Sequence, residues 1–271
     1  MSAGPQSEPP AANQDAAQAE SFAQRAYGAA RSVFRWALAG GYFFMVCPVL
    51  ILISFFVDQK KNDGAQRWLS RSVVRLAGAR YQARRAPGFD PTRTCFFVSN
   101  HVNLFDPFVL YCTVPQYIRG LELESHFRIP VYGWLMKAVG NIPVPETSQP
   151  SDLKRMWRLT RAALDRGTSI VVFAEGRRTI TGRVGDFQDG VFRMALRFGV
   201  PIVPVSIVGA FEFNHKTSWM LRPATITVYL HDTIETVGLS KNGVEELRDR
   251  VWKVVAAPVH ERIKAVEERC R

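Results

Sequence analysis

The sequence lacks the short motifs that identify several large enzyme classes. Its 271 residues contain no GxxxxGK(S/T), GxGxxG, HExxH or GxSxG pattern. Nucleotide-binding, zinc-protease and α/β-hydrolase functions therefore have no motif in their favour.

Cysteine is scarce and scattered. The four cysteines, Cys47, Cys95, Cys112 and Cys270, form no CxxC pair and stand at no zinc-like spacing with histidine. This pattern predicts reduced thiols in a cytoplasmic protein, with neither a metal site nor a disulfide framework.

Acidic residues are nearly absent from one segment. Residues 21–85 carry eleven Lys and Arg residues against two acids, Asp58 and Asp63, and so account for nine of the chain's eleven net positive charges. A basic protein can bind nucleic acid. Here, however, the positive charge brackets an apolar run, which favours an anionic membrane surface and not nucleic acid.

Charge disappears altogether from residues 36–57, a run of 22 residues. The run is long enough to span a bilayer. Pro48 lies within it and predicts a kink, while basic residues on both flanks give no clear direction of insertion. The sequence favours a kinked helix that dips in and stays on the cytoplasmic side, but leaves open whether the run spans or re-enters.

The composition divides the chain into three parts. Residues 1–20 are polar and Ala-rich, which predicts a disordered tail, and they lack the apolar core of a secretory signal. Residues 21–79 predict membrane-anchoring helices, namely the apolar run and a basic amphipathic helix at 65–78. In that helix Arg67, Arg71 and Arg75 share one face and suit lipid phosphates, although a solvated face of a soluble helix fits the same spacing. Residues 80–271 form the globular domain.

The globular domain alternates strands with helices. Apolar runs predict strands near residues 81–83, 95–98, 140–144, 169–173, 202–208 and 225–229. Helical periodicity falls near residues 108–113, 132–139, 153–164, 191–198 and from 244 onward. The pattern predicts an α/β fold with a mixed, mostly parallel central sheet flanked by helices.

His101 and Asp106 form the first candidate site. They follow the apolar run 95–98, and Asp106-Pro107 suits a helix start with Asp as the N-cap. A His beside a carboxylate is a general base held in one tautomer, and ligands gather at this edge of α/β sheets. Alternatively, Asp106 is only a helix cap and His101 only a loop residue.

Two further loops are candidates. In the loop after residues 169–173, Gly176 permits a tight turn, Arg177 and Arg178 suit a phosphate, and Glu175 can orient an arginine or a hydroxyl. A plain solvated turn is the alternative. The segment 199–205, with Pro201 and Pro204, is either structural or a wall for an apolar chain.

Together these segments resemble the glycerolipid acyltransferase family, in particular the bacterial lysophosphatidic acid acyltransferases. The matching stretches are Asn100-His101 to Asp106, Ile129–Trp134, Phe173–Thr179 and Val200–Val205. The resemblance covers roughly residues 80–229, and the family's two-helix anchor matches residues 34–78.

The resemblance implies a fold, a reaction and residue roles. His101 is the base and Asp106 its partner; Asn100, Glu175, Gly176, Arg177 and Arg178 belong to the acceptor site. The acceptor is a lysolipid and the donor is acyl-CoA or acyl carrier protein, with no cofactor or metal. The location is the cytoplasmic face of the inner membrane.

The chain departs from the family at two cationic positions. Glu146 falls where the family has an arginine, and Leu123 or Glu124 falls where it has a lysine. A phosphate beside Glu146 is repelled, so a lyso-aminolipid such as a lyso-ornithine is the alternative acceptor. A catalytically silent lipid-binding protein on the same fold is the other alternative.

Overall fold

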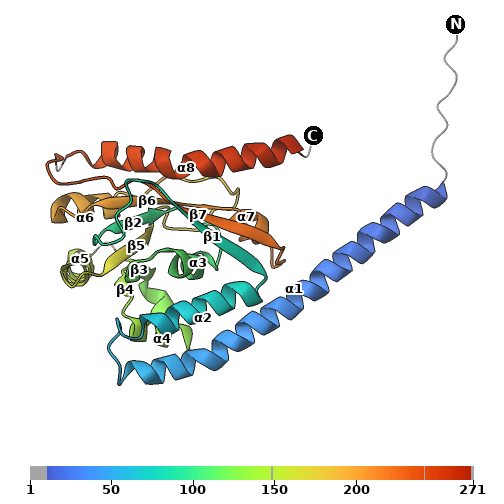
Figure 1. The fold of residues 1–271 in the computed structure, drawn as a ribbon, viewed down its shortest axis with the longest axis horizontal. Coiled ribbons are helices and arrows are strands. Elements are labelled where there is room, and N and C mark those ends of the chain that lie inside the picture. Colours follow the sequence, from blue (N-terminus) through green and yellow to red (C-terminus); the bar gives the residue numbers. More distant parts are fainter. Residues whose placement is uncertain (1–10, 148, 241, 270–271) are drawn as a thin grey trace, which may run out of the picture.

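The computed structural model describes residues 11–147, 149–240 and 242–269. A central sheet carries helices on both faces, and one long helix runs along the domain and projects beyond it (Figure 1). The helices are α1 (Ala11–Ser54), α2 (Asp63–Leu76), α3 (Asp106–Thr113), the 3-10 helix η1 (Glu124–Arg128), α4 (Tyr132–Val139), α5 (Pro150–Asp165), α6 (Gly190–Phe198), α7 (Ala210–Phe213) and α8 (Val244–Arg269). The strands are β1 (Ala79–Arg85), β2 (Phe96–Ser99), β3 (Ile118–Leu123), β4 (Ile142–Val144), β5 (Ser169–Phe173), β6 (Ile202–Val208) and β7 (Ala224–Leu230).

The seven strands lie in the order β1-β7-β6-β2-β5-β3-β4. Every neighbouring pair is parallel except β6 and β7, which are antiparallel. Parallel neighbours need long crossover connections, which the helices supply. The expected α/β fold with a mixed, mostly parallel sheet is confirmed.

The central strands are apolar because both faces of the sheet are covered. All residues of β2 and β6 are buried. Successive side chains point to opposite faces, so Phe97 packs in the core beneath α1, α2, α3 and α4. Phe96 and Val98 pack in the second core, beneath α5, α6 and α8.

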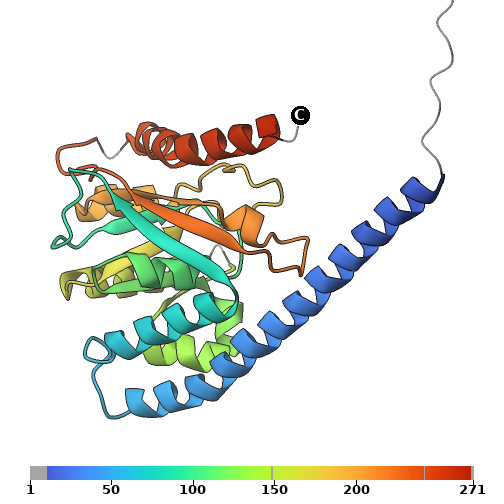
Figure 2. The same cartoon turned by 45° about the vertical axis from the view of Figure 1, so that its right-hand side comes forward.

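Helix α1 lies against the domain with one face and exposes the other. It stays helical through Pro48, and its C-terminal part bends to follow α2 and α4 (Figures 1 and 2). Ala39, Cys47 and Leu50 are buried. The stretch Phe22–Ser54 is long and apolar enough to cross a membrane.

Four parts of the fold differ from the sequence predictions: residues 11–20, β3, η1 and α7. Residues 1–10 of the predicted disordered tail lie outside the described residues, whereas residues 11–20 are helical in the structure; Ala, Gln and Glu, which fill this segment, are good helix formers. The elements β3, η1 and α7 were not predicted. Arg119 and Gly120 interrupt the apolar pattern of β3, although Arg119 is itself buried.

Candidate active site

The candidate site lies where three adjacent parallel strands end. β2 sits between β6 and β5, and Ser99 pairs with Val205 on one side and Phe173 on the other. The loops after β2 and β5 therefore emerge side by side. The first carries His101 and the second carries Glu175.

His101 and Asp106 form a hydrogen-bonded pair. His101 Nδ1 lies 2.8 Å from Asp106 Oδ2. The same oxygen accepts the backbone N–H groups of Val102 (2.6 Å) and Asn103 (2.9 Å). Because a carboxylate oxygen accepts these bonds, Nδ1 donates its proton and Nε2 carries the free lone pair. Asp106 is fully buried, whereas the His101 side chain is 19% exposed.

Asp106 is not the N-cap that the sequence predicts. Helix α3 begins at Asp106 itself, after Phe105, and no side chain caps it. The carboxylate bonds backwards to the loop and not forwards to the first turn of α3. Oδ2 is thus committed to His101 and to the loop that carries it, while Oδ1 is buried with no hydrogen-bond partner among the described residues.

The neighbouring loop fixes the histidine. The imidazole stacks on the Phe173 ring at 4.1 Å between centroids and 18° between planes. The His101 N–H donates to Glu175 Oε1 (2.8 Å), and its carbonyl accepts the Thr179 N–H (2.9 Å). Both the ring and the main chain are therefore held.

Glu175 acts as a brace between two loops. Its Oε2 accepts the N–H of Gly185 at 2.9 Å, while Oε1 binds the main chain of His101. Burial raises the pKa of Glu175, and the two N–H donors oppose that rise. No arginine pairs with it in the described part of the chain. Gly176, at φ +67°, makes the tight turn that follows.

Asn100 does not face a substrate, and this corrects the sequence prediction. It is 1% exposed. Its amide N donates to the Ile207 carbonyl (3.1 Å) and its amide O accepts the Ile207 N–H (2.8 Å). The side chain instead ties the end of β2 to β6.

The two arginines and the two prolines have different surroundings. Arg177 is exposed and Arg178 half-buried, and neither has an ion-pair partner among the described residues. Their role in acceptor binding stays a prediction.

Pro201 and Pro204 are buried at β6, and their carbonyls accept the N–H groups of Phe96 (2.9 Å) and His231 (3.1 Å). These contacts favour the structural alternative.

Arg67 does not lie on a lipid-facing surface, which corrects a second prediction. Its Nε lies 2.6 Å from Asp63 Oδ2. Its Nη1 donates to the Val114 carbonyl (2.6 Å) and its Nη2 to that of Gln116 (2.5 Å). The guanidinium thus binds carbonyls at the C-terminus of α3, where helices favour cations. Arg71 and Arg75 are exposed.

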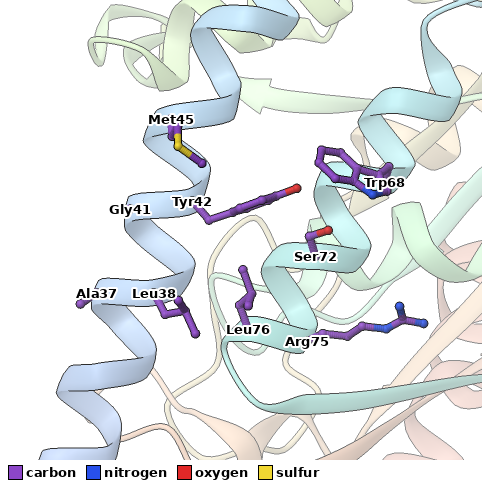
Figure 3. Close-up of a pocket in the computed structure, with 9 residues that line it drawn as sticks. All are labelled: Ala37, Leu38, Gly41, Tyr42, Met45, Trp68, Ser72, Arg75 and Leu76. Atoms are coloured by element: carbon purple, nitrogen blue, oxygen red, sulfur yellow. The ribbon is translucent and has the colours of Figure 1, made fainter.

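An apolar groove of about 580 Å³ runs between α1 and α2 (Figure 3). Tyr42 reaches across it towards α2, and its ring meets Trp68 at 5.6 Å. The lining residues are Ala37, Leu38, Gly41, Tyr42, Met45, Trp68, Ser72, Arg75 and Leu76. No residue of the His101 loop lines it, so the groove belongs to the anchoring helices and not to the candidate active site.

The site has the parts of a general-base enzyme. In the described residues no side chain bonds to His101 Nε2, and no group of three His, Cys, Asp or Glu side chains could hold a metal ion. A histidine oriented by a buried carboxylate can take a proton from a hydroxyl that the substrate brings. The fold and site therefore define a class of transferase or hydrolase in which His101, oriented by Asp106, is the general base.

The chain belongs to the acyltransferase family, whose model matches residues 55–208. A 1-acyl-sn-glycerol-3-phosphate acyltransferase of Brassica napus is 36% identical over 192 residues, which are 69% of this chain and 54% of that one. The chain thus spans about half the length of that relative. A Pseudomonas aeruginosa enzyme of the same name is 26% identical over 238 residues, covering 88% of this chain and 89% of its own. The crystal structure of the Thermotoga maritima 1-acyl-sn-glycerophosphate acyltransferase has the same fold, with a TM-score of 0.71, 22% identity and coverage of 88% and 96%.

Proposed function

We propose that the protein transfers a fatty acyl group from an acyl thioester to the free hydroxyl of 1-acylglycerol-3-phosphate. The His101–Asp106 pair carries the proposal, because its free Nε2 suits proton abstraction from an alcohol. The names of the relatives from Brassica napus and Pseudomonas aeruginosa support this acceptor. Acyl-CoA or acyl carrier protein is the donor.

In the proposed reaction His101 Nε2 takes the hydroxyl proton as the hydroxyl oxygen attacks the thioester carbonyl. A C–O bond forms and the C–S bond breaks. The proton on Nε2 then passes to the departing thiolate. Asp106 stabilises the imidazolium while it exists. Phe173 holds the ring in place, and Glu175 holds the main chain of His101.

Arg177 and Arg178 are the proposed ligands of the acceptor phosphate. They follow β5 on the loop beside His101 and have no ion-pair partner in the described part of the chain. Arginine binds phosphate bidentately. The exposed Arg177 and the half-buried Arg178 are available for that role.

Residues 21–79 are the proposed anchor and residues 80–271 the proposed catalytic domain. In the most apolar 18-residue stretch of α1, only 17% of the stretch is buried. The exposed large apolar residues of α1 include Phe34, Phe44, Met45, Val49 and Leu52, and the exposed Phe55 and Phe56 follow its end directly. A helix that spanned the bilayer would have to leave α2 and α4, which favours a monotopic anchor on the cytoplasmic face of the inner membrane.

A lyso-aminolipid acceptor is the second candidate. Glu146 is exposed just after β4, at the same edge of the sheet as His101. Among the described residues it has no ion-pair partner. A free carboxylate there favours a head group that carries a cation.

The test is an acceptor panel with the purified full-length protein in lipid vesicles. Lysophosphatidic acid, lyso-ornithine lipid and lysophosphatidylethanolamine are offered with acyl-CoA and with acyl carrier protein thioesters. Preferential formation of phosphatidic acid supports the first proposal. A preference for an aminolipid supports the second, and no acylation of any acceptor overturns both in favour of a silent lipid-binding protein.

A further inference from the structure

The loop between α7 and β7, residues 214–223, is bonded directly to α1. We call it the bridging loop. Trp36 Nε1 donates to the Trp219 carbonyl at 2.7 Å. One turn earlier, Ser32 Oγ accepts the N–H of Leu221 at 3.1 Å, and both residues are fully buried. The anchoring helix therefore holds the bridging loop at two points.

Asn214 joins the bridging loop to the loop that carries His101. Its side-chain nitrogen donates to the carbonyls of Ser218 (2.8 Å) and Met220 (3.1 Å). Its own carbonyl accepts a hydrogen bond from Asn103 Nδ2 at 3.1 Å. Asn214 is 6% exposed, so these bonds are shielded from competing water.

Asn103 completes the connection to the catalytic pair. Its Nδ2 also donates to the Ala210 carbonyl (2.8 Å), and its Oδ1 accepts the N–H of Phe105 (2.8 Å). Its backbone N–H donates to Asp106 Oδ2, the oxygen that binds His101. Asn103 is fully buried and all its side-chain bonds go to main chain.

A direct packing contact runs beside these hydrogen bonds. The Trp36 ring lies 5.5 Å from the ring of Phe105, the residue before Asp106. Phe105 is 2% exposed and packs edge-on against Phe213 at 5.2 Å. A shift of α1 at Trp36 would thus displace both the bridging loop and the loop that carries His101.

None of Trp36, Asn103 and Asn214 belongs to a strand, and the sheet does not need them for its pairing. Their bonds link segments that are distant in sequence and end on the oxygen that orients His101. We propose that these three are positioning residues, through which the seating of α1 on the domain sets the geometry of the His101–Asp106 pair. The proposal rests on the acyl-transfer function proposed above and makes the anchor a part of the catalytic apparatus.

The first test compares Trp36→Phe and Asn214→Ala with wild type, as full-length protein in phosphatidylcholine–phosphatidylglycerol vesicles. Trp36→Phe keeps an aromatic ring and removes only the N–H donor. We expect kcat to fall about fivefold, the factor that corresponds to one net hydrogen bond, while KM for the acceptor and co-sedimentation with vesicles stay unchanged. A merely structural role would lower the melting temperature and leave the kcat of the folded protein unchanged.

Two variants serve as controls. Thr217→Ala lies on the bridging loop, where the exposed Thr217 bonds only to His215. Trp157→Phe makes the same chemical change on α5, where Trp157 packs on Phe198 and has no hydrogen bond to the bridging loop. Both should keep the wild-type kcat.

The second test does not depend on activity. Amide hydrogen exchange of a peptide covering residues 101–106 should be faster in Trp36→Phe and Asn214→Ala than in wild type, and unchanged in Thr217→Ala. Unchanged exchange in both bridge variants overturns the positioning role. If the wild type transfers no acyl group but exchange still responds, the connection stands and the proposed function fails.

Discussion

Replacing Asp106 with Asn separates the charge of the carboxylate from its shape. The amide oxygen can still accept the N–H groups of Val102 and Asn103, because all of these bonds go to one oxygen, Oδ2. The loop therefore keeps its geometry. What disappears is the negative charge 2.8 Å from His101 Nδ1, which stabilises the imidazolium during proton transfer.

The size of the effect follows from that one bond. A hydrogen bond to a charged group contributes about 2 to 3 kcal/mol, whereas a neutral one contributes about 1 kcal/mol. The transition state loses the difference, about 1 to 2 kcal/mol, so kcat falls roughly 5- to 30-fold. Stability should fall by about 1 to 3 kcal/mol, because the amide nitrogen takes the place of Oδ1, which is buried and has no hydrogen-bond partner in the described part of the chain.

The assay is initial-rate formation of acylated product by the purified variant in vesicles, with thermal unfolding as the control. Asp106→Ala is the matched comparison, because it removes the acceptor of the Val102 and Asn103 N–H groups together with the charge and should lower the rate further. A folded Asp106→Asn protein with kcat within about twofold of wild type would refute the charge argument, given the roughly fivefold lower bound above.

Three further predictions concern the brace, the anchor and pH. In Glu175→Gln the side chain keeps only one oxygen, so the N–H of either His101 or Gly185 loses its hydrogen-bond partner. We expect kcat to fall about tenfold and KM for the lysolipid to stay unchanged. A rise in KM alone would instead make Glu175 a substrate ligand. Arg67→Ala should lower the free energy of unfolding by about 2 to 3 kcal/mol, because the carbonyls at the C-terminus of α3 lose the guanidinium that binds them. Arg71→Ala should change the free energy of unfolding by no more than about 0.5 kcal/mol. Equal urea midpoints for the two variants would contradict this. Burial lowers the pKa of His231 from its ordinary 6.5, so the unfolded chain binds the proton more readily and the free energy of unfolding should decrease as pH falls below about 6.5. His231→Asn should flatten that slope in urea titrations between about pH 5 and 7.5, and an unchanged slope would exclude His231 as its source.

The parts of the site that lie on regular patterns could be predicted from the sequence. An apolar run followed by a polar loop marks the carboxyl end of a buried strand, and this pattern found the loops of both His101 and Glu175. The pairing of His101 with Asp106 followed from their short separation. The mixed sheet followed from the alternation of strands and helices.

The contacts that depend on long-range packing could not be predicted. Asn100 adjoins the histidine in sequence, but β6 takes both of its polar atoms. Arg67 shares a helical spacing with Arg71, yet the end of α3 lies against it. Asn103 carried no signal in the sequence, because its partners Ala210 and Asn214 are more than a hundred residues away.

The most direct measurement is acyl transfer by purified His101→Ala protein that is shown to be folded and bound to vesicles. If His101 Nε2 is the base, the rate should fall about 10²- to 10⁴-fold, the usual contribution of general-base catalysis, while vesicle binding stays at the wild-type level. A folded, vesicle-bound variant that keeps a rate within a few-fold of wild type would contradict the account.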